Sequence, residues 1–152
     1  MRYIWILLFL FLVGCGEDEV KPTGKTATYT IEPYGASSVS AIATLTELSN
    51  GYTRVELVLS GTDASKNYLA HIHFGNISKF GFIATHLGNS DDKNISIRQE
   101  VTNTVYSYDD WISFDGYIAI HIDDDDKYPI VSVGNIGANV DWFLLTDHPV
   151  LG

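Results

Sequence analysis

Two histidines stand two residues apart in the segment Tyr-Leu-Ala-His-Ile-His-Phe-Gly, residues 68–75. Side chains alternate between the two faces of a β-strand, so His71 and His73 would share one face. A third histidine, His121, lies in a second alternating segment, 117–123. Imidazoles directed to one point from neighbouring strands suit Cu²⁺ or Zn²⁺. These three residues are therefore candidate metal ligands, with a structural or hydrogen-bonding role as the alternative.

Each of these segments has a purely apolar face opposite its histidines. In the first segment this face consists of Ala70, Ile72 and Phe74, and in the second it consists of Ile118, Ile120 and Ile122. We expect the apolar faces to form the core and the histidines to point away from it, toward solvent. Within 80–87, His86 shares a face with Phe82 and Ala84, which predicts a packed residue at the core edge and a weaker metal ligand. His148, beside Pro149, is expected to be exposed.

The elements that must position these residues are strands. Apolar segments alternate with period two and are rich in Val, Ile, Thr and Tyr, which indicates an all-β domain. Asn50-Gly51 predicts a tight turn joining two antiparallel strands. The expected fold is an antiparallel Greek-key β-sandwich or small barrel of about eight strands. The predicted strands are 26–32, 38–48, 52–60, 68–74, 80–87, 95–101, 117–123, 130–134 and a further segment, 140–145.

Two loops have a binding interpretation and a structural one. The segment 105–117 interleaves aromatic and acidic residues, and Tyr106, Tyr108 and Trp111 could hold a sugar or an envelope protein. The structural alternative, which we favour, is a crossover loop whose aromatic rings plug one end of the domain. The aspartates 123–126 could gather Ca²⁺, but their spacing does not match a calcium loop, which favours a solvated hairpin loop.

The first residues indicate export. Met1-Arg2 precedes an apolar run of 11 residues, 3–13, which is shorter than the ~20 residues that span a bilayer. Leu12-Val13-Gly14-Cys15 resembles the bacterial lipobox, in which the cysteine is acylated and becomes the mature N-terminus. Cys15 is the only cysteine, which excludes a disulfide within the chain. We expect a signal peptide over 1–14 and an acyl anchor, including palmitate, on Cys15.

The residues after Cys15 predict where the protein is sorted. Gly16 stands where an aspartate would favour retention in the inner membrane, so resemblance to known sorting rules favours the outer membrane. The acidic cluster Glu17-Asp18-Glu19 is similar to surface-export signals of some lipoproteins, with a solvated linker as the alternative. Residues 15–25 are expected to form a lipidated linker, and 26–152 one domain.

The charge of the chain excludes two classes of partner. The net charge is −10, and loss of Arg2 with the signal peptide makes it one unit more negative. Nucleic acid and anionic headgroups would be repelled. Since no phosphate loop, nucleophile elbow or spaced carboxylate pair is present, the sequence predicts no enzymatic activity.

Short motifs resemble those of the CHRD domain, a β module first noted in chordin. The segments that carry the resemblance are Gly51–Thr62, Leu69–Gly75, Asp115–Ile122 and Pro129–Asn139, with His71, His73, Gly116, Tyr117 and His121 at motif positions. The resemblance covers about 36–139 and implies a β fold in the cell envelope. The family's terminal Gly-Glu-Ile-Arg-Gly segment has lost its acid and its arginine here, and the family has no well-defined activity.

The same segments are more distantly similar to copper–zinc superoxide dismutase, an eight-stranded Greek-key barrel. This resemblance implies copper ligands at His71, His73, His86 and His121. The stretch 87–115 has no histidine for a zinc site, no arginine follows Arg98 to steer an anionic substrate, and a disulfide pair is missing. We therefore expect an outer-membrane or surface CHRD-like binding or structural module. The alternative is a copper- or zinc-binding protein of dismutase-like fold without dismutase activity.

Overall fold

The described part of the chain is built from eight antiparallel strands. The computed structural model describes residues 19–123 and 128–140. The only helical elements whose two ends lie within these ranges are a 3₁₀ turn, η1 (Ile77–Lys79), and one short helix, α1 (Tyr108–Ile112). The strands are β1 (Pro22–Pro33), β2 (Ser40–Leu48), β3 (Thr53–Ser60), β4 (Asn67–Phe74), β5 (Ile83–Asn89), β6 (Ser96–Val101), β7 (Asp115–Asp123) and β8 (Ile130–Gly137).

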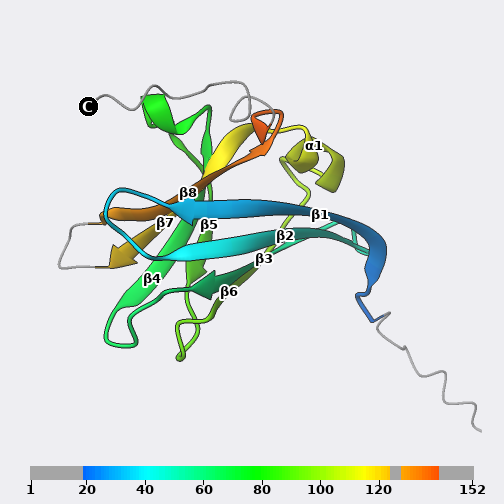
Figure 1. Ribbon diagram of the computed structural model, residues 1–152. Helices are drawn as coiled ribbons and strands as arrows, with labels where there is room; N and C mark the ends of the chain where they lie inside the picture. The colour runs from blue at the N-terminus through cyan, green and yellow to red at the C-terminus, as the bar shows by residue number, and fades with distance from the viewer. Residues whose placement is uncertain (1–18, 124–127, 141–152) are drawn as a thin grey trace, which may run out of the picture.

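The strands form one sheet that bends into a nearly closed barrel. Their order is β5-β4-β7-β8-β1-β2-β3-β6, and its two end strands, β5 and β6, contact each other. In Figure 1 the blue to teal strands β1, β2 and β3 form one layer, and β4, β7 and β8 cross behind it. The chain crosses from β3 in one layer to β4 in the other layer, and it crosses back between β5 and β6 and again between β6 and β7. As a result, β3 pairs with β6 and β4 pairs with β7. The expected all-β Greek-key class is confirmed.

The hairpin between β2 and β3 forms where Asn50-Gly51 predicts it. Gly51 has a φ of +83°, a conformation that L-residues rarely adopt. Asn50 Oδ1 accepts a hydrogen bond from the backbone N–H of Tyr52 at 3.1 Å. The turn sets a continuous register from Glu47 opposite Thr53 to Ser40 opposite Ser60.

The core lies where the apolar faces of the strands meet. Ala70 and Ile72 of β4 and Ile118 and Ile120 of β7 are fully buried in it, as the alternation predicts. Phe74 is the exception, because it is 40% exposed. It pairs with Gly116 at the end of the β4–β7 ladder and packs against Phe114 at the end of the core.

Three boundaries differ from the predicted ones by three residues or more. β1 begins at Pro22, so the last residues of the expected linker belong to the sheet. β5 begins at Ile83, because Phe80 has a φ of +42° after the η1 turn and cannot continue a strand. β8 continues to Gly137. Within the described ranges, no helix is long and apolar enough to cross a membrane.

Several predictions fall outside the described residues. These are the signal peptide 1–14, the lipidated Cys15, the acidic residues Glu17 and Asp18, aspartates 124–126, His148, and the predicted strand over 140–145 beyond its first residue.

Candidate metal centre

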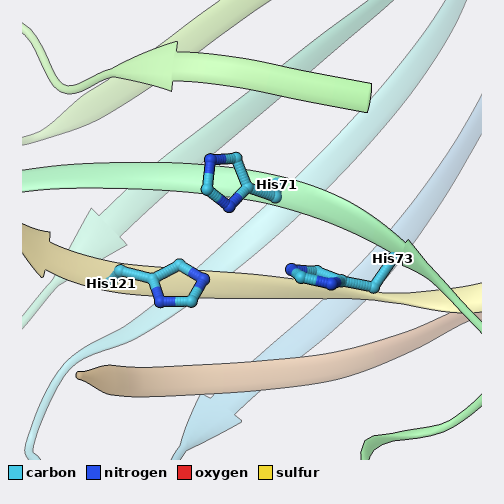
Figure 2. Close-up of side chains that lie close together, drawn as sticks. All are labelled: His71, His73 and His121. Atoms are coloured by element: carbon cyan, nitrogen blue, oxygen red, sulfur yellow. The ribbon is translucent and has the colours of Figure 1, made fainter. Parts of the chain in front are cut away.

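Strands β4 and β7 bring His71, His73 and His121 together. In the β4–β7 ladder, His71 lies opposite Ala119 and His121 lies opposite Leu69, so His121 is diagonal to His71 on the same face. The ring centroid of His71 is 5.7 Å from that of His73 and 5.1 Å from that of His121, and the third separation is 6.1 Å. Figure 2 shows the three rings gathered over this strand pair. Each ring offers one nitrogen, and these nitrogens lie within 4.8 Å of one another.

Backbone carbonyls hold two of the rings by Nδ1. His73 Nδ1 is 2.9 Å from the carbonyl oxygen of Gly81, and His121 Nδ1 is 2.8 Å from that of Tyr128. A carbonyl can only accept, so in both rings Nδ1 carries the proton and Nε2 keeps its lone pair. Both Nε2 atoms are buried and have no hydrogen-bond partner. The two rings thus present unprotonated nitrogens that the protein itself does not satisfy.

Burial favours the neutral form of His71 and His121. Burial, followed by the charges that His121, His86 and His73 would carry, lowers the pKa of His71 to about 4. Burial also lowers the pKa of His121, against the opposite effect of its hydrogen bond to Tyr128. Deprotonated imidazole is the form that binds a metal, so these shifts favour metal binding at neutral pH.

The face that carries the histidines is not the wet surface that alternation predicts. His121 is only 7% exposed, and Tyr117 and Ala119 on the same face are buried. The connection between β4 and β5 folds over this face, as the contact of Gly81 with His73 shows, and the chain around Tyr128 reaches it from the other side. The expectation of solvent-facing histidines is therefore wrong, because loops cover a face whose strands alone would be half solvated.

His86 occupies a different position from the predicted one. It was expected at the core edge, but it is exposed, because β-bulges in the β4–β5 ladder shift the register on both sides of the pair His71–His86. Its ring centroid is 4.5 Å from that of His71. Both residues line an opening of about 440 Å³ beside the cluster, together with Leu69, Ile83, Gly88, Asn89 and Tyr128. His86 thus stands at the entrance to the cluster.

The three-histidine cluster could hold a metal ion. Each nitrogen bound to Zn²⁺ lies about 2 Å from it, so two such nitrogens are at most about 4 Å apart. The widest separation of the nitrogens would have to close by at least about 1 Å. Three imidazoles would leave one position of a four-coordinate ion for water or an external ligand.

The aromatic residues of the 105–117 segment lie mainly inside the domain. Trp111 is fully buried, Tyr108 is 4% exposed, and both belong to the core cluster. Tyr106 is partly buried and packs against Trp111 at 4.8 Å between ring centroids. This arrangement agrees with the end plug, and it leaves little ring surface for a ligand. A ligand-binding role of these three residues stays a prediction.

Three contributors to the cluster were not identified from the sequence. Gly81 and Tyr128 act through backbone carbonyls, which no residue type reveals. Tyr117 lies opposite His73 and stacks on its ring, with centroids 4.9 Å apart and an interplanar angle of 8°. An antiparallel register that puts the apolar faces of 68–74 and 117–123 on the same side of the sheet places Tyr117 on the face of His73.

Comparison of the chain with models of protein families, with curated proteins and with solved structures finds no match.

Proposed function

We propose that this protein binds a copper or zinc ion through His71, His73 and His121. The observation that carries the proposal is the pair of buried, unpartnered Nε2 atoms on His73 and His121. Leaving a buried acceptor unsatisfied costs about 1–3 kcal/mol, so the fold maintains this arrangement at an energetic cost. A cation bound to both atoms would remove that cost.

The donor set supports copper or zinc over other ions. Mg²⁺ and Ca²⁺ prefer oxygen ligands, whereas neutral imidazole suits Cu²⁺ and Zn²⁺. The cluster consists of three histidines without a carboxylate. The Irving–Williams order favours Cu²⁺ when both ions compete for such nitrogens.

The same proposal places the domain in the cell envelope. Cys15, within Leu12–Cys15, would carry the acyl chains that anchor the protein to the outer membrane, with the domain on the periplasmic side or at the cell surface. The role is binding, without dismutase activity, because the sequence lacks the arginine, the second histidine set and the cysteine pair of that enzyme. A CHRD-like or dismutase-like relationship rests on the short sequence motifs and is part of the proposal.

Isothermal titration of the metal-free protein with Cu²⁺ and with Zn²⁺ tests the proposal. We expect one ion per wild-type chain, and at least about 100-fold weaker binding in His121→Ala and His71→Ala, because two nitrogens remain. Thr44→Ala, on the outer face of β2, is the matched control and should bind like the wild type. Equal binding by the wild type and both histidine variants would exclude this site.

The anchor has its own test. Wild-type protein made in bacteria grown with labelled palmitate should carry the label, and Cys15→Ser should not. A label that persists in Cys15→Ser would contradict lipidation at this residue.

A further inference from the structure

Tyr117 is held directly against one of the proposed ligands. It lies opposite His73 in the β4–β7 ladder, and the two rings are stacked nearly parallel. The tyrosine is 1% exposed, so neighbouring side chains leave it little room to move. A fixed aromatic plane against an imidazole restricts rotation of the imidazole about its Cβ–Cγ bond.

Gly81 contacts both rings of this stack. Its carbonyl oxygen accepts the Nδ1 proton of His73 at 2.9 Å. Its backbone also lowers the pKa of the Tyr117 phenol, although the larger effect of burial raises it. One peptide segment therefore lies against both the histidine and the tyrosine.

The position of Gly81 is set by close packing of the backbone. A Cβ at this residue would overlap the carbonyl oxygen of Phe74, so only glycine fits. The N–H of Phe74 donates to the carbonyl of Phe82 at 2.9 Å, which fixes the chain on the far side of Gly81. Tyr117 and Gly81 thus form a rigid bracket around His73.

We propose that Tyr117 is a positioning residue of the metal centre, which together with Gly81 fixes the tautomer and the ring orientation of His73. The bracket keeps the proton on Nδ1 and keeps Nε2 available to the ion shared with His71 and His121. Groups that orient metal-binding histidines commonly change affinity by 10–100-fold when they are removed. The use of the bracket for a metal rests on the proposed function, whereas its effect on the tautomer does not.

Two variants separate the contributions of the ring and the hydroxyl. Tyr117→Phe keeps the stacked ring and loses only the hydroxyl, and Tyr117→Leu loses both the aromatic ring and the hydroxyl. Tyr68→Phe is the matched control: Tyr68 is equally buried, its hydroxyl accepts a hydrogen bond from the backbone N–H of Asp63, and it lies on the core face of β4. It should reduce stability without changing the metal centre.

The metal-bound readout is Cu²⁺ affinity together with the electron paramagnetic resonance spectrum. We expect Tyr117→Leu to bind Cu²⁺ about 10-fold more weakly or worse, with altered g and hyperfine values along the copper axis. The Cu²⁺ affinity of Tyr117→Phe should lie between that of Tyr117→Leu and that of the wild type. Tyr68→Phe should match the wild type in both affinity and spectrum. Wild-type affinity and spectrum in Tyr117→Leu would overturn the proposed role while leaving metal binding intact.

The metal-free readout is the ¹⁵N chemical shifts of the His73 ring. The wild type should show the tautomer protonated at Nδ1, and Tyr117→Leu should show a mixture of both tautomers. Unchanged shifts in Tyr117→Leu would overturn the bracket. If the wild type bound no copper, the proposed function would fail, and the ring shifts would still decide whether Tyr117 positions His73.

Discussion

The outer faces of the two halves of the barrel differ although their strands alternate in the same way. On β2 and β3, the residues turned away from the core are polar or exposed, such as Val58 at 55% exposure and Arg54, which pairs with Glu100 of β6. On β4 and β7, the corresponding face carries His73, Ala119 and His121, and the last two are buried. Alternation sets which residues share a face, and the connecting loops decide whether that face meets water.

The covered face of β4 and β7 is also a more polar environment than the core between the two halves of the barrel. The core between the halves contains mainly aliphatic and aromatic side chains, whereas the covered face buries imidazole nitrogens without partners. A protein surface hidden by loops, with unsatisfied acceptors beneath them, suits a ligand that enters from the side. The exposed face of β2 and β3 has no such feature among its described residues.

The largest difference between the faces should appear when a charge is introduced on each. Ala119→Lys places an ammonium group where the native residue is fully buried, and we expect a loss of about 3 kcal/mol or more in the free energy of unfolding. Val58→Lys, on the exposed face, should change it by less than about 0.5 kcal/mol. Urea denaturation of the metal-free proteins measures both. Similar losses in the two variants would contradict the view that only one outer face is covered.

Metal binding at the covered face should raise the free energy of unfolding by a somewhat smaller amount than Ala119→Lys lowers it. An ion that binds only the folded state at 100 times its dissociation constant adds about 2.7 kcal/mol to the free energy of unfolding. We expect Zn²⁺ to raise the Tm of the wild type, EDTA to reverse the rise, and His73→Ala to show none. Arg54→Ala, on the other face, should respond to Zn²⁺ like the wild type. A rise in His73→Ala equal to that of the wild type would place the bound ion elsewhere.

Acid should weaken the covered face of the metal-free protein. The pKa of His71 is lowered to about 4 and that of His121 is also lowered, mainly by burial. In the unfolded chain both titrate near pH 6.5. The unfolded state therefore binds more protons between these limits, and stability is lost as the pH falls from about 6.5 toward 4. Urea midpoints at pH 7.5, 5.5 and 4.5 measure this loss.

A variant links the acid effect to the histidines. His71→Asn cannot take up a proton in this range, so its urea midpoint should fall less between pH 7.5 and 4.5 than that of the wild type. Because His71 is partly solvated, we expect the acid effect to be smaller than the effect of saturating metal. An identical pH dependence in the wild type and the variant would assign the loss to other groups.

The sequence predicts the features of the fold that depend on local patterns. The Asn50-Gly51 turn and the apolar stripes of β4 and β7 are found where the periodicity and the turn chemistry place them. The grouping of His71, His73 and His121 also follows from pattern, because residues that share a face on paired strands come close. These predictions need only the backbone geometry of a strand and an antiparallel neighbour.

The remaining features depend on contacts between distant segments. The chain at Tyr128 covers His121 and the loop after β4 covers His73, and neither segment is marked by residue type. The exposure of His86 follows from two bulges in the β4–β5 ladder, between which the alternation of faces is displaced by one residue. Such shifts arise from how two strands fit together and leave no periodic signal in either one.

The smallest effect is expected at the ion pair on the exposed face. Arg54 donates from Nε and Nη2 to the same oxygen of Glu100, at 3.1 and 2.8 Å. The carboxylate is 41% exposed, so water and salt screen the attraction. A double-mutant cycle of Arg54→Ala and Glu100→Ala should give a coupling of about 0.2–1 kcal/mol that falls in 1 M NaCl. A larger coupling, unaffected by salt, would mean that this face is as well shielded from water as the face that carries the histidines.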